Sequence, residues 1–363
     1  MNQELFTNLP SELIINILSR LPIRTIISCK CVCKSWLNLL DTPEFARSHF
    51  SRSVPGLILW QRQRDLDSEH FEIFEFEDEL DLERHELHYS PVTKISCREF
   101  INEEHPGLGI QGSANASSSW NYPILPTTVT YGFGASKASG QHKVVRIYHE
   151  CIRVPDTHEL LGIPKSECRV YTLGTGSWRS IAPGPKLEYN SRSIGAFLNG
   201  NLHWLVADSE GFARISCLDL ETEVFSTFSA PPDLPETSRF LGGLTVLGDC
   251  LCVCDNTSDD EIVIWLMKEY GVEKSWTKEF VIRKLPDYAG ESYEVVYPIK
   301  IFKDGDIMMA WDDFHLFYHS IKNKTTASVD IAALQTAGCI AAMLHTPTFL
   351  SLKSFAMENV RSF

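Results

Sequence analysis

The sequence predicts an α+β multidomain protein, in which a small all-helical unit over residues 1–50 precedes an all-β body over residues 55–355. Apolar residues recur at helical spacing up to Phe50, whereas short strands separated by turn residues follow Pro55. Charge is also unevenly distributed, because the first 50 residues carry about +1 within a net charge of -14. We therefore expect two domains with different roles, followed by a short tail over residues 356–363.

The composition excludes several classes of protein. A mean hydropathy of -0.10 and 44% hydrophobic residues are typical of a globular protein. The sequence has neither an apolar run of about 20 residues that could span a membrane nor a secretory signal. Eleven scattered cysteines suit reduced thiols, and the acidic net charge disfavours nucleic-acid binding. We expect a cytoplasmic and/or nuclear protein that binds neither nucleic acid nor membranes.

The helical unit begins at Asn8-Leu9-Pro10-Ser11-Glu12, where Asn8 is a candidate cap and Pro10 suits a helix start. Five apolar residues of this helix fall on one arc of roughly 140° and are Leu13, Ile14, Ile17, Leu18 and Leu21. A second helical stretch runs from Ile26 to Leu40, and a third starts at Asp41-Thr42-Pro43-Glu44. So few residues cannot complete a core alone, so the apolar side chains must be covered either by the rest of the chain or by a partner.

Three segments resemble the F-box, especially its plant form: Leu9-Pro10-Ser11-Glu12-Leu13-Ile14, Ile17-Leu18-Ser19-Arg20-Leu21-Pro22 and Cys31-Val32-Cys33-Lys34-Ser35-Trp36. The resemblance implies that the unit binds a Skp-family adaptor and, through it, a cullin and a RING subunit. Some matching residues would contact the adaptor and others would form the core of the F-box. They are Leu9, Pro10, Leu13, Ile14, Ile17, Leu18, Leu21, Pro22, Val32 and Trp36.

Cysteines at positions 29, 31 and 33 could suggest a metal site. Alternate residues on a helix diverge by about 200°, so these thiols cannot converge on one ion. We expect them to be packing residues, and we expect no metal and no cofactor.

The β body is predicted to consist of hairpins that repeat about every fifty residues. Turns at Asn199-Gly200, Gly248-Asp249 and Asp304-Gly305 lie 49 and 56 residues apart. A second set of hairpins alternates with the first, over residues 169–181, 215–226, 262–277 and 314–330. Two hairpins per repeat make four strands, which is the blade of a β-propeller and kelch-like in length. A β-sandwich is the alternative.

The body resembles the F-box-associated domain of plant proteins. The resemblance rests on Tyr131-Gly132-Phe133-Gly134, on Lys143-Val144-Val145-Arg146-Ile147, and on residues 195–205 and 218–223. That family also has an apolar Cys-Asn-Gly-Leu hairpin before its Leu-Pro, whereas residues 112–126 here keep only the ends of the pattern. Ala, Ser and Gly cannot form a buried strand pair, so we expect an incomplete blade near residues 104–128.

The sequence contains no recognisable catalytic motif, since P-loop, His-Glu-x-x-His, Gly-x-Ser-x-Gly and Cys-x-x-Cys patterns are all missing. Residues 65–86 hold eleven acidic residues against one arginine. This run is either a solvated loop and strand edge or a docking site for a basic substrate segment.

We therefore predict a non-catalytic substrate-recognition subunit of an SCF-type ubiquitin ligase. A β-propeller scaffold that works outside a ubiquitin ligase is the alternative, and an enzyme built on a propeller is a more remote one. The unidentified protein substrate is expected to bind the polar connections 149–167, 184–193, 229–240 and 284–295. Candidate contact residues there are Tyr189, Arg192, Arg239, Phe240, Tyr288 and Tyr293.

Overall fold

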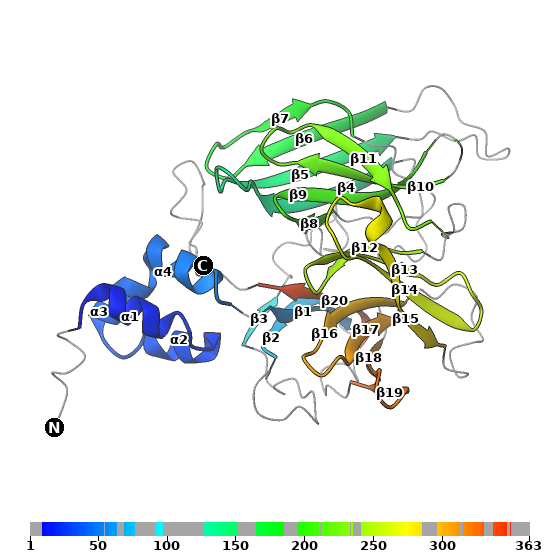
Figure 1. Cartoon of the computed structure of the whole chain (residues 1–363). Helices are drawn as coiled ribbons and strands as arrows, with labels where there is room; N and C mark the ends of the chain where they lie inside the picture. Colours follow the sequence, from blue (N-terminus) through cyan, green and yellow to red (C-terminus); the bar gives the residue numbers. More distant parts are fainter. Residues whose placement is uncertain are drawn as a thin grey trace.

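The computed structural model describes residues 9–53, 55–63, 69–76, 92–96, 127–150, 165–184, 195–208, 210, 212–232, 234, 241–284, 296–311, 315–329, 337–346 and 349. Within these residues, four short helices precede strands that form five four-stranded antiparallel sheets (Figure 1). The prediction of a helical unit followed by a β-propeller-like body is confirmed.

The helices are α1 (Ser11–Leu18), α2 (Ile23–Cys29), α3 (Lys34–Leu40) and α4 (Pro43–Phe50). The single helical stretch expected from Ile26 to Leu40 is wrong, because α2 and α3 are separate. Cys33 is extended between them, and its Sγ accepts a hydrogen bond from the backbone N–H of Trp36. Cys33 is therefore the N-cap of α3, a role that Ser, Thr or Asp would more commonly take.

Each sheet is a four-stranded blade. The first blade consists of β20 (Ala337–His345), β1 (Gly56–Gln63), β2 (Glu69–Phe74) and β3 (Thr93–Ser96). The second consists of β4 (Thr127–Ala135), β5 (His142–Glu150), β6 (Lys165–Thr172) and β7 (Trp178–Ile181), and the third of β8 (Ala196–Leu198), β9 (Asn201–Ala207), β10 (Ala213–Asp219) and β11 (Phe225–Ser229). The fourth consists of β12 (Leu241–Leu247), β13 (Cys250–Asp255), β14 (Glu261–Met267) and β15 (Trp276–Arg283), with a 3-10 turn η1 (Glu273–Ser275), and the last of β16 (Val296–Ile301), β17 (Ile307–Trp311), β18 (His315–Ser320) and β19 (Thr325–Ser328). All the hairpins predicted from the sequence are present.

The backbone angles of two hairpin turns explain why Asn, Gly and Asp occur there. Asn199 and Gly200 have φ angles of 54° and 81°, and Gly248 and Asp249 have φ angles of 56° and 61°. Positive φ at both central residues is what a type I′ turn between twisted strands requires, and Gly and Asn tolerate it best.

The first blade is closed by the end of the chain. Strand β20 pairs antiparallel with β1 from Gly56↔His345 to Gln63↔Ala337 and takes the position that β4, β8, β12 and β16 take in the other sheets. These inner strands contact one another in the order β4, β8, β12, β16 and β20. The chain thus returns to its own start to complete a sheet.

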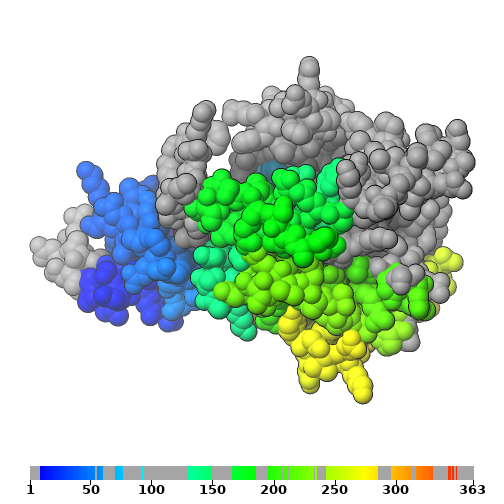
Figure 2. Space-filling model, turned by 90° about the horizontal axis from the view of Figure 1, so that it is seen from above, coloured from blue at the N-terminus to red at the C-terminus, as the bar shows by residue number. Residues whose placement is uncertain are grey.

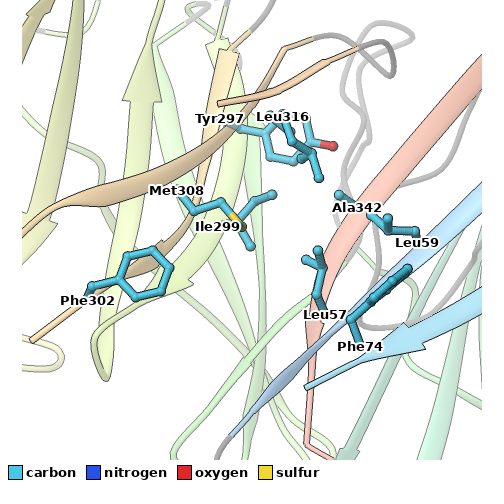
Figure 3. Close-up of a cluster of buried hydrophobic side chains, with 10 residues drawn as sticks. Leu57, Leu59, Phe74, Tyr297, Ile299, Phe302, Met308, Leu316 and Ala342 are labelled. Atoms are coloured by element: carbon cyan, nitrogen blue, oxygen red, sulfur yellow. The ribbon is translucent and has the colours of Figure 1, made fainter. Parts of the chain in front are cut away.

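Hydrophobic cores lie between successive blades. One core joins β4–β7 to β8–β11, the next joins β8–β11 to β12–β15, and a third joins β12–β15 to β16–β19. Figure 3 shows the fourth core, in which Leu57, Leu59 and Phe74 of the first blade face side chains of β16–β18.

The described residues form no such shared core between the first blade and β4–β7. The face of β4–β7 that points away from β8–β11 carries Phe133 and Trp178, both substantially exposed. In sequence, the incomplete blade predicted near 104–128 falls at this position, between β3 and β4. Nearly all of it lies outside the described residues, so it remains a prediction.

The glycine-rich motif of β4 has a packing explanation. Gly132 forms a parallel bridge with Gly195 at the start of the next blade. A Cβ on Gly132 would lie 2.6 Å from a methyl carbon of Leu202, and one on Gly195 would lie 2.8 Å from the Trp204 ring. Only glycine allows these inner strands to approach so closely over the buried Trp204.

Candidate functional site

The first three helices of the unit and the segment between α2 and α3 leave large apolar side chains exposed, and we call this set the exposed apolar face. Its large side chains are Leu13 and Ile17 of α1, Ile27 of α2, Val32, and Leu37 of α3, each between 39% and 63% exposed. Soluble monomers seldom leave so many large apolar side chains uncovered within 25 residues. Such a surface is typical of a protein-binding site.

The opposite side forms the core of the unit. Its buried residues are Ile15, Leu18, Ile26, Cys29, Leu40 and Phe45. The apolar arc predicted on α1 contributes to both sides, because Leu18 is buried while Leu13 and Ile17 are exposed. Ile15, which the prediction did not include, is also buried. An apolar residue recurs on both sides of this short helix, and packing decides which side is covered.

The residues implied by the F-box resemblance divide accordingly. Leu18 is buried in the core, Ile14, Leu21 and Trp36 pack half-buried against it, and Leu9 is half-buried. Leu13, Ile17 and Val32 are exposed, as are Pro10 and Pro22, which precede α1 and α2. Asn8, proposed as a cap, lies outside the described residues.

The sequence reasoning left Ile27 and Leu37 out of the candidate site, although both belong to the exposed face. Pro22 could have indicated this, since a proline can begin a new helix. In a helix that begins after Pro22, the adjacent residues Ile26 and Ile27 point in different directions. Ile26 is buried and Ile27 is not.

The six candidate substrate contacts, Tyr189, Arg192, Arg239, Phe240, Tyr288 and Tyr293, lie outside the described residues and remain predictions. The strands that flank their loops can be placed. Because each blade is antiparallel, one edge of it holds the beginnings of its first and third strands and the ends of its second and fourth strands. The connections 149–167, 184–193, 229–240 and 284–295 all attach there, so we call this edge of the propeller the long-loop face.

The other edge, which we call the turn face, carries the short hairpin turns such as Asn199-Gly200. Strand β20 ends and β1 begins at this edge, because β20 is the inner strand of its blade. The helical unit connects to β1 directly and so joins the propeller at the turn face. Figure 2, seen from above, shows the helices at one end of the molecule, beside the propeller.

A buried histidine of the propeller, His203, forms hydrogen bonds that hold neighbouring blades together. The Nδ1 of His203 lies 2.9 Å from the carbonyl oxygen of Ala196, so Nδ1 carries the proton and Nε2 accepts from the Tyr270 hydroxyl at 2.8 Å. Burial lowers the pKa of His203 to about 4, against an opposing effect of the Ala196 hydrogen bond. Neutral His203 therefore ties β9 to the β14–β15 connection.

A second buried tie joins two blades. Lys143 Nζ on β5 donates to Glu223 Oε1 at 2.8 Å and to the Leu220 carbonyl, and Arg179 also pairs with Glu223. Desolvation raises the pKa of Glu223, but these two cations outweigh it and hold that pKa below its usual value. Both cations contact the same carboxylate oxygen, Oε1.

The cysteine trio has three different surroundings, since Cys29 is in the helical core, Cys31 is exposed and Cys33 caps α3. In the described part of the chain, no group of three or more His, Cys, Asp or Glu side chains is arranged to hold a metal ion. Nor does any described helix have the length and apolarity needed to cross a membrane.

Comparison with known families agrees with this architecture. Residues 6–48 match the F-box domain, and residues 118–327, more than half of the chain, match the F-box associated beta propeller domain. The chain belongs to the F-box-associated β-propeller family. Its exposed apolar face is therefore part of an F-box, and the five sheets are blades of the associated propeller.

Similar proteins of Arabidopsis thaliana are named as F-box proteins. F-box protein CPR1 is 24% identical, with 89% of this chain and 84% of that protein aligned. F-box/kelch-repeat protein At3g23880 is 26% identical, with 79% and 83% aligned. Among solved structures, HIRA(644-1017) is 11% identical over 57% of this chain and 55% of that one, with a TM-score of 0.25, which is too low to support an inference.

Proposed function

We propose that this chain is the substrate-recognition subunit of an SCF-type ubiquitin ligase. The F-box, within residues 1–50, binds a Skp-family adaptor, which brings the cullin and the RING subunit. The propeller, within residues 55–355, binds the protein to be ubiquitinated. The chain itself is non-catalytic and works in the cytoplasm and/or the nucleus.

The exposed face formed by Leu13, Ile17, Ile27, Val32 and Leu37 carries the proposal. Full burial of a large apolar side chain contributes roughly 1.5–3 kcal/mol. Since these five are about half buried already, covering the rest gives a gross gain of about 5 kcal/mol from this face alone. Flanking contacts add to it, so the face can support specific binding against the cost of association.

Placement of the two binding regions supports the same function. The F-box joins the propeller at the turn face, whereas the connections predicted to select the substrate attach at the long-loop face. Adaptor and substrate could therefore be bound at once without competing for one surface.

The adaptor role is tested with purified full-length chain and a purified Skp-family adaptor by calorimetric titration. We expect Ile17→Lys combined with Val32→Lys to abolish binding, because two charges would have to be desolvated in the interface. Val281→Lys, a change at an equally exposed valine on β15, is the matched control and should bind normally. Wild-type affinity in the double variant would show that the interface is elsewhere.

The ligase role needs a second assay. A reconstituted cullin complex should ubiquitinate a captured substrate only when the chain has an intact adaptor face. If the chain binds the adaptor but supports no cullin-dependent ubiquitination, the alternative of a propeller scaffold outside a ubiquitin ligase is favoured.

The substrate face is tested by exchanging the four long-loop connections for those of a related receptor. We expect the exchange to redirect ubiquitination and leave the adaptor affinity unchanged. Retention of the original substrate after the exchange, together with its loss when the 65–86 carboxylates are neutralised, would assign recognition to the acidic run instead.

A further inference from the structure

The F-box is tied to the propeller by side chains that come from distant parts of the sequence. The first is Glu75, which follows β2. Its Oε1 accepts a hydrogen bond from the backbone N–H of Ile23 at 2.6 Å, and its Oε2 lies 3.5 Å from Arg24 Nε. Pro22, the residue before α2, has no side chain that could cap this helix. The propeller therefore supplies the carboxylate that caps α2, at the positive end of its dipole.

Glu75 is itself held in place by its neighbours. Phe74 is completely buried in the core of Figure 3, and Phe76 packs against Phe302 with a ring-centroid distance of 5.7 Å. Lys300 Nζ lies 4.0 Å from the centre of the Phe76 ring. The residues on both sides of the cap thus pack into the core shared by β1–β2 and β16–β18.

The second tie is Phe349, four residues beyond the end of β20. Its ring centroid lies 5.8 Å from that of Phe45 and 5.0 Å from that of His49, both buried residues of α4. Lys30 Nζ lies 5.4 Å from the centre of the same ring. Burial lowers the pKa of His49, so its ring is neutral at pH 7 and packs as an aromatic group. A residue from the end of the chain therefore completes the core of the F-box.

The short connection between α4 and β1 is also held. Arg52 Nη1 donates to Ser19 Oγ at 2.8 Å, and the backbone N–H of Ser53 donates to the carbonyl of His49 at 2.8 Å. The connection thus continues the fold of α4 up to Ser53 instead of acting as a free linker.

From these contacts we propose that Glu75 and Phe349 lock the F-box to the turn face of the propeller in one orientation. A single covalent connection leaves a domain free to rotate, whereas contacts from three separate segments do not. If the proposed ligase function holds, the lock fixes the direction in which the long-loop face presents a substrate relative to the adaptor. The lock itself does not depend on adaptor binding.

The test uses the full-length chain without any partner. Labels carried by unnatural amino acids at positions 34 and 303, both exposed lysines, report the distance between F-box and propeller without disturbing the cysteines. We expect a single narrow distance distribution in the wild type and one at least twice as wide in Glu75→Ala combined with Phe349→Ala. Phe212→Ala, at an exposed phenylalanine between β9 and β10, is the control and should leave the distribution narrow.

Hydrogen exchange gives a second readout. In Glu75→Ala, the amide of Ile23 should exchange about tenfold faster, because its acceptor is lost. Glu75→Gln loses the charge and one carboxylate oxygen but keeps an oxygen acceptor for the Ile23 amide, so the increase should be smaller. A wild-type distribution that is already broad, or a double variant with wild-type width and unchanged Ile23 exchange, would overturn the proposal, whatever the result of the adaptor titration.

Discussion

Truncation to alanine of two neighbouring residues on α1 should affect different properties, adaptor affinity for one and folding stability for the other. Ile17 is 51% exposed and Leu18 is 3% exposed. Ile17→Ala removes surface that only a partner can cover. Half of the roughly 1.5–3 kcal/mol for a buried isoleucine is about 1 kcal/mol, or about a fivefold weaker Kd for the adaptor. Leu18→Ala leaves a cavity in the F-box core and should cost about 2–5 kcal/mol of folding free energy.

Calorimetric titration with the adaptor and differential scanning calorimetry of the free chain separate the two effects. Ile17→Ala should keep the wild-type melting temperature and lose affinity. Leu18→Ala should lower the melting temperature, and its affinity should fall only at temperatures where the F-box begins to unfold. If Ile17→Ala destabilises the free chain as much as Leu18→Ala does, the division of α1 into a core side and a binding side is wrong.

Three further predictions concern the propeller. The pKa of His203 is lowered to about 4, so stability is fully present above its ordinary value of 6.5 and is lost as pH falls below it. His203 should account for about 2 kcal/mol of the stability lost between pH 7 and pH 5, so urea unfolding of His203→Gln should show a loss smaller by that amount. Gly132→Ala should lower the melting temperature by the equivalent of about 1–3 kcal/mol, because its Cβ would overlap Leu202; an unchanged melting temperature would refute the close approach of β4 to the β9 side chains. Val253→Pro, in the second strand of its blade, should lower the free energy of unfolding by about 3 kcal/mol or more. An unchanged melting temperature followed by β-type circular dichroism would contradict the pairing of this strand.

Much of the fold could be predicted because its signals are local. Asn199-Gly200 and Gly248-Asp249 specify tight turns within a few residues, so the hairpins could be located without any knowledge of their neighbours. The roughly fifty-residue repeat then indicated four strands per blade. The helical unit was recognisable for the same reason, since prolines and apolar spacing mark short helices.

The candidate site was predicted less completely, because exposure is not a local property. Apolar residues occur on both sides of α1, and the sequence cannot say whether Leu13 and Ile17 or Ile15 and Leu18 meet the core. The break between α2 and α3 was missed because Cys33 serves as a cap, a rare role for a thiol.

A helical F-box followed by repeated four-stranded hairpin units could be inferred from the amino-acid sequence alone. The closure of the first blade by β20 against β1, the cap that Glu75 provides for α2 and the entry of Phe349 into the F-box core became evident only from the folded chain. These features differ in how far apart along the chain the interacting residues lie. Turns and helix caps depend on residues within a few positions, whereas these contacts join segments about 50 to 300 residues apart, and only the packing of the whole chain selects them.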